Sequence, residues 1–168
     1  MLMTGQGSRP QSLVISDFNN DDLIDNGVVN ALTHSIDIFL GYGNMSFTSQ
    51  VAYSTPPYLS PCAMAVGDFN NVTRVDIVCG SCDSDNVSIL LGYSNGSFGN
   101  LMAYSTRSNS SRYSLAVGDM NNDSIQDIVI ANHDNNNLGV FMGYANRTFA
   151  SIILFPLHYG SNPFTIAI

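Results

Sequence analysis

The chain of 168 residues lacks Glu, Lys and Trp, so its 13 acidic residues are all Asp and its 5 basic residues are all Arg. Glu and Lys are good helix formers, whereas Asp, Asn, Gly and Ser favour turns and caps. This composition argues against a helical protein. No stretch approaches the roughly 18–20 apolar residues that span a bilayer, so we expect no membrane span. The opening residues, MLMTGQGSRP, also lack the apolar segment of a signal peptide.

Basic residues are scarce, and the formal net charge is −8. Nucleic acids and anionic membranes are bound by clusters of Lys and Arg, so neither is an expected partner. Acidity that comes from Asp alone points instead to divalent cations, which take oxygen ligands.

A repeat of 51 residues organises the chain. Three groups of identical residues keep this spacing: Asp17, Asp68 and Asp119; Gly41, Gly92 and Gly143; and Phe47, Phe98 and Phe149. Each repeat reads as four short strands rich in Val, Ile, Leu and aromatic residues, bounded by turn residues. The third strand is apolar on both faces, as in Ile89-Leu90-Leu91, which suits a strand covered by neighbouring sheets. Four strands in about 50 residues predict an all-β fold of β-propeller blades.

The repeat also sets the expected boundaries. We expect an unstructured leader over 1–11, three blades of antiparallel strands over 12–61, 62–112 and 113–162, and the first strand of a truncated fourth repeat over 163–168. The first repeat departs from the other two at its second strand, where NGVVNA (residues 26–31) replaces IVCGSC and IVIANH. We expect that strand to be weaker or shifted.

A nine-residue loop between the first two strands carries the candidate chemistry. Oxygen-bearing side chains occupy loop positions 1, 3, 5 and 9, and a backbone carbonyl at position 7 can join them. Ca²⁺ takes six to eight oxygen ligands, so we predict two Ca²⁺ sites. Their ligands are Asp17, Asn19, Asp21, Leu23 and Asp25 in the first repeat, and Asp119, Asn121, Asp123, Ile125 and Asp127 in the third. The closing Glu of an EF-hand is missing, which excludes that motif.

The second copy of the loop keeps Asp68, Asn70 and Asp76 but has Val72 at position 5. One carboxylate is lost, so we expect a weak or empty site there. The alternative for all three loops is a set of Asx-turns, in which Asp and Asn accept hydrogen bonds from their own backbone.

The motifs DFNND-x-x-x-D, DIV and LLGY-x-NGSF, repeated in this order, resemble the FG-GAP/VCBS repeat family, which forms the blades of the integrin α-subunit propeller. The resemblance covers residues 12–168. It implies one Ca²⁺ for each intact loop, and adhesion or ligand binding outside the cell. Only the metal-loop residues transfer, and Val72 breaks their pattern.

Three cysteines are present. Cys79-Gly-Ser-Cys82 has C-x-x-C spacing but falls in an expected strand, which argues against a thioredoxin-like role. If Asp68 and Asp76 flank the loop, Cys62 and Cys82 face each other across the first two strands of the second repeat. We therefore predict a Cys62–Cys82 disulfide, with Cys79 as a small core residue.

Glycosylation sequons recur in the turn between the third and fourth strands, at Asn44, Asn95 and Asn146. One glycan on each blade is a reasonable arrangement at the rim of a propeller. The alternative is that an Asn-rich turn was inherited through duplication.

The sequence contains no Ser/His/Asp or Cys/His arrangement and no phosphate-cradling glycine motif, so we expect no enzyme activity. The first hypothesis is a secreted or cell-surface adhesion module, stabilised by Ca²⁺, that binds an unknown protein or glycan. The second is a structural fragment of a longer protein, and the third is a set of blades that accompanies a catalytic domain encoded elsewhere. Three blades leave open edges, through which the chain could self-associate, for example as a six-bladed ring of two copies.

Overall fold

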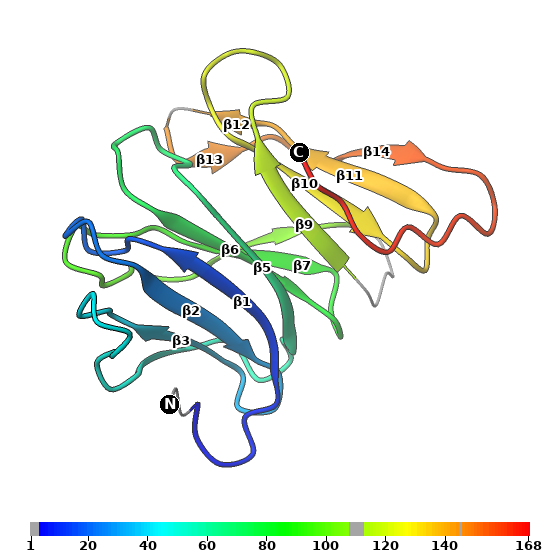
Figure 1. Ribbon diagram of the computed structural model, residues 1–168. Coiled ribbons are helices and arrows are strands. Elements are labelled where there is room, and N and C mark those ends of the chain that lie inside the picture. Colours follow the sequence, from blue (N-terminus) through cyan, green and yellow to red (C-terminus); the bar gives the residue numbers. More distant parts are fainter. Residues whose placement is uncertain (1–3, 108–112, 145) are drawn as a thin grey trace.

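The computed structural model describes residues 4–107, 113–144 and 146–168, and these ranges contain strands and turns but no helix. Three four-stranded antiparallel sheets follow one another along the chain (Figure 1). We call them blades 1, 2 and 3. Blade 1 contains β1 (Pro10–Ser16), β2 (Asp25–Asn30), β3 (Ser35–Phe39) and β4 (Val51–Ser54). Blade 2 contains β5 (Pro61–Gly67), β6 (Asp76–Ser81), β7 (Asn86–Leu90) and β8 (Met102–Ser105). Blade 3 contains β9 (Tyr113–Gly118), β10 (Asp127–Asn132), β11 (Asn137–Phe141) and β14 (Ile153–Pro156).

The repeat seen in the sequence is the repeat of the fold. The second strands begin at Asp25, Asp76 and Asp127, and the third strands begin 51 residues apart in the same way. In blade 3 the turn before the outer strand forms a small hairpin of β12 (Gly143–Tyr144) and β13 (Thr148–Phe149). Single bridges, Gly41↔Phe47 and Gly92↔Phe98, take its place in blades 1 and 2. The all-β prediction with four-stranded antiparallel units is confirmed.

The hydrophobic core lies between the sheets. One cluster joins Phe18, Ile36 and Ile38 of blade 1 to Met64, Ile77 and Leu90 of blade 2. The other joins Phe69, Val87 and Ile89 of blade 2 to Ile128, Ile130 and Phe141 of blade 3. The first strands lie side by side, β1 beside β5 and β5 beside β9 (Figure 1). In blade 2, which contributes to both clusters, the second and third strands are covered on both faces and can be apolar throughout, as the sequence indicated.

The expectation of a weaker or shifted second strand in the first repeat is wrong. β2 pairs with both β1 and β3 in the same register as β6 and β10, and all six of its residues are buried. The Val29 side chain packs in the core between blades 1 and 2, on the same strand as the small Gly27. The register is set by Asp25, which begins the strand as Asp76 and Asp127 begin theirs.

Both ends of the chain differ from expectation. β1 begins at Pro10, inside the expected leader, and the carbonyls of Arg9 and Ser8 extend the hairpin by accepting hydrogen bonds from Ala31 N and Leu32 N. The strand expected at 163–168 is not formed. Each first strand in this fold pairs with the second strand of its own blade, and the 168 residues include no such partner for 163–168.

Candidate functional site

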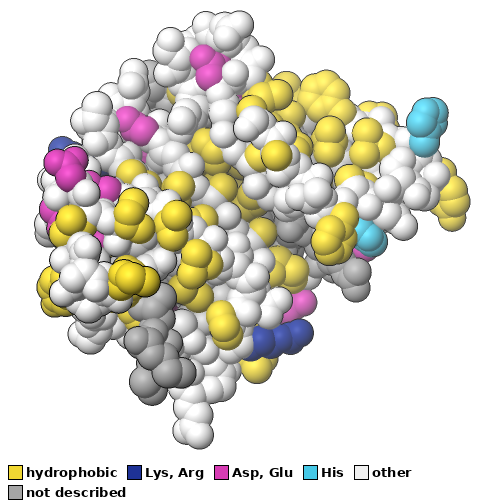
Figure 2. All heavy atoms as spheres, in the orientation of Figure 1, with side chains coloured by type: hydrophobic (Ala, Val, Ile, Leu, Met, Phe, Trp, Pro, Cys, Tyr) yellow, Lys and Arg dark blue, Asp and Glu magenta, His cyan; other side chains and the backbone are white. Residues whose placement is uncertain are grey.

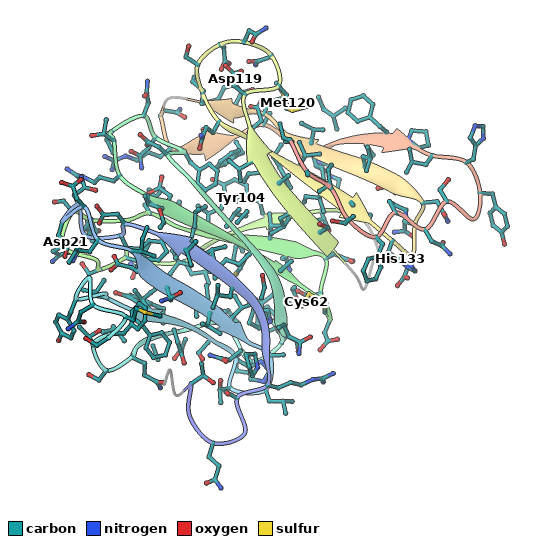
Figure 3. The ribbon with its side chains drawn as sticks, viewed as in Figure 1. Asp21, Cys62, Tyr104, Asp119, Met120 and His133 are labelled. Carbon is teal, nitrogen blue, oxygen red and sulfur yellow. A yellow bond between two sulfur atoms is a disulfide. The ribbon has the colours of Figure 1, made fainter. Side chains whose placement is uncertain are left out.

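The three nine-residue loops connect the first and second strands of each blade. Asp21 marks the loop of blade 1 and Asp119 the loop of blade 3 in Figure 3, where Cys62 lies away from both, toward the other end of the inner strands. The three backbones share an unusual feature at loop positions 4 and 6, which have positive φ. Position 4 is Asn20, Asn71 and Asn122, with φ of 59°, 54° and 60°. Position 6 is Asp22, Thr73 and Ser124, with φ of 64°, 59° and 65°.

Asn and Asp tolerate this left-handed conformation, whereas a β-branched residue such as Thr73 is strained in it. The loop geometry is therefore kept in blade 2 even where the sequence suits it less well.

The aspartate at position 1 holds the turn together. Its two carboxylate oxygens accept hydrogen bonds from the backbone N–H groups of positions 3, 5 and 6. For Asp17 the donors are Asn19 N, Asp21 N and Asp22 N, at 3.3, 3.1 and 2.7 Å. Asp68 and Asp119 make the same three bonds in their own loops. This part of the loop matches the Asx-turn alternative, and it is intact in all three copies.

The aspartate at position 5 distinguishes the first and third loops from the second. Asp21 accepts a hydrogen bond from Asn19 Nδ2 at 2.9 Å and another from Leu23 N at 2.9 Å. Asp123 accepts the equivalent bonds from Asn121 Nδ2 and Ile125 N, at 2.9 and 2.8 Å. Each oxygen accepts one of these bonds and keeps further acceptor capacity, because a carboxylate offers about four lone-pair sites. Both carboxylates are exposed to solvent.

The aspartate at position 9 has a structural role that the sequence did not reveal. Asp25 is fully buried, and it accepts one hydrogen bond from Phe18 N and one from Gly41 N, both at 2.7 Å. Asp76 and Asp127 bind the equivalent N–H groups of their blades, at 2.7 to 3.0 Å. Each clamp ties the loop to a glycine that lies two residues after the end of the third strand and 16 positions after the aspartate.

The repeated glycines complete these clamps. A Cβ atom at Gly41, Gly92 or Gly143 would lie 2.2, 2.1 or 2.4 Å from the backbone carbonyl oxygen of loop position 8. Real Cβ contacts are essentially never this short, so the close approach of the two segments requires glycine. The signal for the clamp was present in the sequence as the joint recurrence of Asp25 and Gly41.

Burial and neighbouring charge shift the carboxyl pKa values. Burial raises the pKa of Asp25, and the nearby Asp21 and Asp17 carboxylates raise it further, against the opposing effect of its two backbone donors. Burial raises the pKa of Asp76 to about 6. For the exposed Asp119, desolvation alone would raise the pKa, but the backbone N–H donors of its loop together outweigh it and hold the pKa below the usual value. In loop 1 the Asp17 and Asp21 carboxylates thus act on Asp25 through their charge.

The second loop is rearranged where Val72 replaces aspartate. Asn70 has no carboxylate at position 5 to bind, and its Nδ2 instead donates to Asp76 Oδ2 at 3.0 Å. Its side chain is buried, whereas Asn19 is partly exposed and Asn121 is exposed. The amide at position 3 thus turns away from solvent in this loop and toward it in the other two.

The structure brings the predicted ligands of each loop into one turn, but they do not converge as a cluster of carboxylates. Among the described residues, no group of three or more His, Cys, Asp or Glu side chains lies close enough to hold a metal ion. The position 9 carboxylates are buried, whereas those of positions 1 and 5 accept hydrogen bonds from backbone N–H groups of the loop itself.

The cysteines lie in blade 2. Cys62 and Cys82 form a disulfide, and Cys79 is a buried free thiol whose pKa burial raises to about 12. Their pairing does not follow the simple register used to predict it. Ala63 pairs with Gly80 and Pro61 with Ser81, so Cys62 is the extra residue of a β-bulge that aims its side chain at Cys82.

The three sequon asparagines are exposed and occupy equivalent turns. In each turn the Asn side-chain oxygen accepts hydrogen bonds from the backbone N–H and the hydroxyl of the residue two positions later, which is Ser46, Ser97 or Thr148. The asparagine side chains thus stabilise these turns. This structural role fits the alternative that the turn was inherited through duplication.

A buried polar cluster on blade 1 had no counterpart in the sequence analysis. Asp37 of β3 is 1% exposed, and neither of its carboxylate oxygens has a hydrogen-bond partner among the described residues. Burial raises its pKa, and the nearby Ser35 and Asn30 side chains oppose that shift. The equivalent residues in blades 2 and 3 are Ser88 and Gly139.

At the end of the inner strands away from the loops, an open groove of about 550 Å³ is lined by residues that include Gln11, Ser12, Cys62, Ser114, His133 and Phe164. Three blades contribute to it, because each first strand begins there. Its lining is mixed in polarity and contains no Asp or Arg.

Comparison with solved structures identifies the fold. Virginiamycin B lyase from Staphylococcus aureus superposes with a TM-score of 0.70 at 15% identity, over 98% of this chain and 47% of that protein. A streptogramin B lyase gives a TM-score of 0.67 at 16% identity, over 99% of this chain and 47% of that protein. This chain therefore spans about half the length of these structures, and at such low identity the likeness concerns the propeller-like fold alone.

Comparison of sequences finds a known repeat in the middle of the chain. No curated protein sequence matches the chain. The model of the FG-GAP-like repeat matches residues 73–130, from the second loop through the third loop and into β10. The matched segment contains the Asp119 turn, the Asp127 clamp and the Gly92 turn described above. This chain accordingly carries an FG-GAP-like repeat over these residues.

Proposed function

We propose that the chain is a Ca²⁺-binding, non-catalytic repeat module that acts in adhesion or ligand binding outside the cell. The observation that carries the proposal is the difference between loops. Loops 1 and 3 add to the position 1 carboxylate an exposed carboxylate at position 5 and an exposed or partly exposed amide at position 3, whereas loop 2, with the same backbone, has Val72 and a buried amide. A purely structural turn would not need the carboxylate at position 5, because loop 2 keeps its fold with Val72.

The donor chemistry fits Ca²⁺ in loops 1 and 3. In loop 1 the side-chain ligands would all be oxygens, from Asp17, Asn19 and Asp21, if the Asn19 amide turns its oxygen outward. Loop 3 offers the equivalent oxygens from Asp119, Asn121 and Asp123 if the Asn121 amide turns in the same way. The Leu23 and Ile125 carbonyls and water molecules would complete the coordination. Burial is the main cause of the raised pKa of Asp25, and a bound cation would offset the smaller contribution from the Asp21 and Asp17 carboxylates. Asp25 and Asp127 would support the site mainly as clamps.

The disulfide supports a location in an oxidising compartment, since such bonds form and persist in secreted and extracellular proteins. Exposed sequon asparagines on all three blades are compatible with that location. The described residues contain no helix long and apolar enough to cross a membrane. The lyase activity that names the two structural neighbours is not carried over, because the likeness is one of fold.

Thermal unfolding with Ca²⁺ and with a chelator tests the proposal. Extracellular Ca²⁺ modules often have Kd values near 10⁻⁴–10⁻³ M, so millimolar Ca²⁺ should add about 1–2 kcal/mol of stability for each occupied site. The double variant Asp21→Asn/Asp123→Asn should lose this increase, because it removes one ligand charge from each loop. The variant Asp83→Asn, at an exposed position outside the loops, is the control and should retain the increase.

If the folded wild type shows no response to Ca²⁺, the loops are Asx-turns only. The chain would then be a structural part of a longer repeat protein, as the second hypothesis states.

A further inference from the structure

The three loops differ in charge as well as in candidate ligands. Loop 1 (residues 17–25) contains four aspartates and loop 3 (residues 119–127) contains three, and neither contains a basic residue. Loop 2 (residues 68–76) contains two aspartates and Arg74, so its net charge is −1 where those of loops 1 and 3 are −4 and −3. Aspartate side chains show on the surface at the left and the top of Figure 2, where loops 1 and 3 lie. Loop 2 therefore has the smallest charge for a bound cation to offset.

In blade 2, the turn between the third and fourth strands lies over loop 1 of the preceding blade. Phe98, at the end of this turn, packs against Phe18 of loop 1 with ring centroids 5.6 Å apart. Gly96, at the tip of the turn, comes close to a candidate ligand, since a Cβ atom there would lie 3.3 Å from Asn19 Cβ. The residue at this turn position thus faces the loop of the preceding blade, and in blade 2 it brings no side chain.

Blade 3 places an arginine at the same turn position. Its turn is seated over loop 2 in the same way, because Phe149 packs against Phe69 with ring centroids 5.5 Å apart. Arg147 stands where blade 2 has Gly96, on a backbone with a φ of 71° that glycine adopts more easily. Burial raises the pKa of Asp76, and the Arg147 charge opposes that shift together with the two backbone N–H donors. The Arg147 charge therefore acts on a carboxylate of loop 2.

Blade 3 also supplies a hydrogen-bond acceptor to loop 2. Gln126 Oε1, from loop position 8 of blade 3, accepts the backbone N–H of Asp68 at 2.7 Å. The equivalent residue of blade 2 is Val75, whose side chain cannot accept a hydrogen bond. Loop 2 thus receives a positive charge and an acceptor from the blade that follows it, and the equivalent residues of blade 2 offer loop 1 neither.

We propose that blade 3 stabilises loop 2 in place of a metal ion, with Arg147 as the cation and Gln126 as an added hydrogen-bond partner. The residues of loop 2 do not fit Ca²⁺, because Val72 offers no oxygen ligand, the Asn70 amide is buried against Asp76, and two arginines lie in or over the loop. The chain then has two loops that respond to Ca²⁺ and, between them, one that does not. The response of loops 1 and 3 rests on the proposed function, whereas the role of Arg147 does not.

A cation that belongs to the chain cannot be removed by a chelator. The contact between blade 3 and loop 2 should therefore be the same with and without Ca²⁺, while loops 1 and 3 lose their ions when Ca²⁺ falls.

Hydrogen exchange measured by NMR, in chelator and at low salt, tests the role of Arg147 without any metal ion. Arg147→Met removes the charge and copies Met45, which occupies this turn position in blade 1 with a φ of 64°. Arg147→Lys keeps the charge and is the matched control. The amides of Val72 and Thr73, which donate to Asp68, should exchange about two- to fivefold faster in Arg147→Met than in Arg147→Lys.

Salt and a second loop show whether such a difference is electrostatic and local. It should disappear in about 1 M salt, where charges are screened within about 3 Å. It should also be absent from the equivalent amides of loop 3, those of Asp123 and Ser124. Equal exchange of loop 2 in the two Arg147 variants at low salt would overturn the proposal.

Calorimetric titration with Ca²⁺ tests the exclusion of the metal from loop 2. Val72→Asp supplies the missing carboxylate, and Val72→Asp/Arg147→Met also removes the arginine charge. The double variant should bind Ca²⁺ at loop 2 about threefold or more tightly than Val72→Asp does, because a positive charge close to the site repels the ion. Equal affinity of the two variants would mean that Arg147 does not take the place of the metal. A wild type that binds no Ca²⁺ would overturn the proposed function of loops 1 and 3, and the exchange experiment would still decide the role of Arg147.

Discussion

At the scale of single residues, the position 9 aspartates show how one side chain can set the register of a sheet. Asp76 accepts N–H groups from Phe69 and Gly92, which lie 7 and 16 residues away, and it does so while fully buried. Hydrogen bonds to charged acceptors are stronger than neutral ones, so the clamp fixes the loop and the end of the third strand at once. This explains why β2 keeps the common register although its sequence is less apolar.

Replacing the Asp76 clamp by asparagine is therefore expected to destabilise the protein. Asp76→Asn places an NH₂ group against one of the two backbone donors and leaves that donor unpaired, which costs about 1–3 kcal/mol. Chemical unfolding at neutral pH measures the loss. Asp83→Asn, at an exposed position of the same blade, should leave the midpoint unchanged. Equal stability of the two variants would show that Asp76 does not clamp the loop.

Asp37 is expected to have the opposite effect, because its buried carboxylate has no hydrogen-bond partner among the described residues. Asp37→Ser, which copies Ser88 of blade 2, should raise the stability at neutral pH by about 1–3 kcal/mol.

The pH dependence of Asp37 gives an independent measurement. Its pKa is raised in the folded state, so the folded protein binds the proton more tightly than the unfolded chain does. The contribution to stability is therefore present below the unfolded pKa of 3.8 and is lost as pH rises through the raised folded value. Unfolding curves for wild type and Asp37→Ser should diverge as pH rises from about 4, with the variant more stable. Parallel curves would contradict this assignment.

At the scale of the elements, the sequence predicted the strands well because the pattern of each strand recurs three times at a spacing of 51 residues. It grouped the candidate ligand residues by type and spacing, and the structure brings those residues into one turn, while their metal role stays a prediction. Two features were missed in the sequence analysis, although the recurrence of Asp25 with Gly41 was a signal for the first of them. The clamp depends on a contact between Asp25 and Gly41, and the bulge at Cys62 depends on how the hairpin closes. Both arise from pairing across strands, which residue types and local spacing do not encode directly.

The comparison between loops leads to a gain-of-function prediction. Val72→Asp restores the position 5 carboxylate in a loop whose backbone already matches loops 1 and 3. If the proposed Ca²⁺ sites exist, the number of bound ions measured by titration calorimetry should rise from two to three for each chain. Val72→Asn, which is polar but uncharged, is the matched control and should bind clearly less tightly at that loop. An unchanged number of sites in Val72→Asp would count against a metal role for position 5.

The disulfide is expected to be the main covalent support of blade 2. It joins residues separated by 20 positions, and closing a loop of that size constrains the unfolded chain by about 3 kcal/mol. The double variant Cys62→Ser/Cys82→Ser should lose stability of that order in chemical unfolding. Thiol titration of the denatured, non-reduced wild type should find one free thiol, Cys79, and three free thiols would exclude the bond.

At the scale of the whole molecule, the three blades have similar sequences and different surroundings. Blade 2 is packed on both faces, whereas blade 3 leaves Met120 and Phe155 half exposed. In repeat proteins stability is approximately the sum of a term for each repeat and a term for each interface between neighbours. The middle blade has two such interfaces, so its strands should open least often.

Hydrogen exchange measured by mass spectrometry tests this gradient between equivalent strands. The amides of β7 should exchange more slowly than those of β11, although the two strands have the same length and the same pattern of pairing. The difference should shrink in the Met64→Ala variant, which weakens the interface between blades 1 and 2 and leaves the one between blades 2 and 3 in place. Equal protection of β7 and β11 in the wild type would mean that each blade is stable independently. Stability would then reside in the clamps and turns of each repeat.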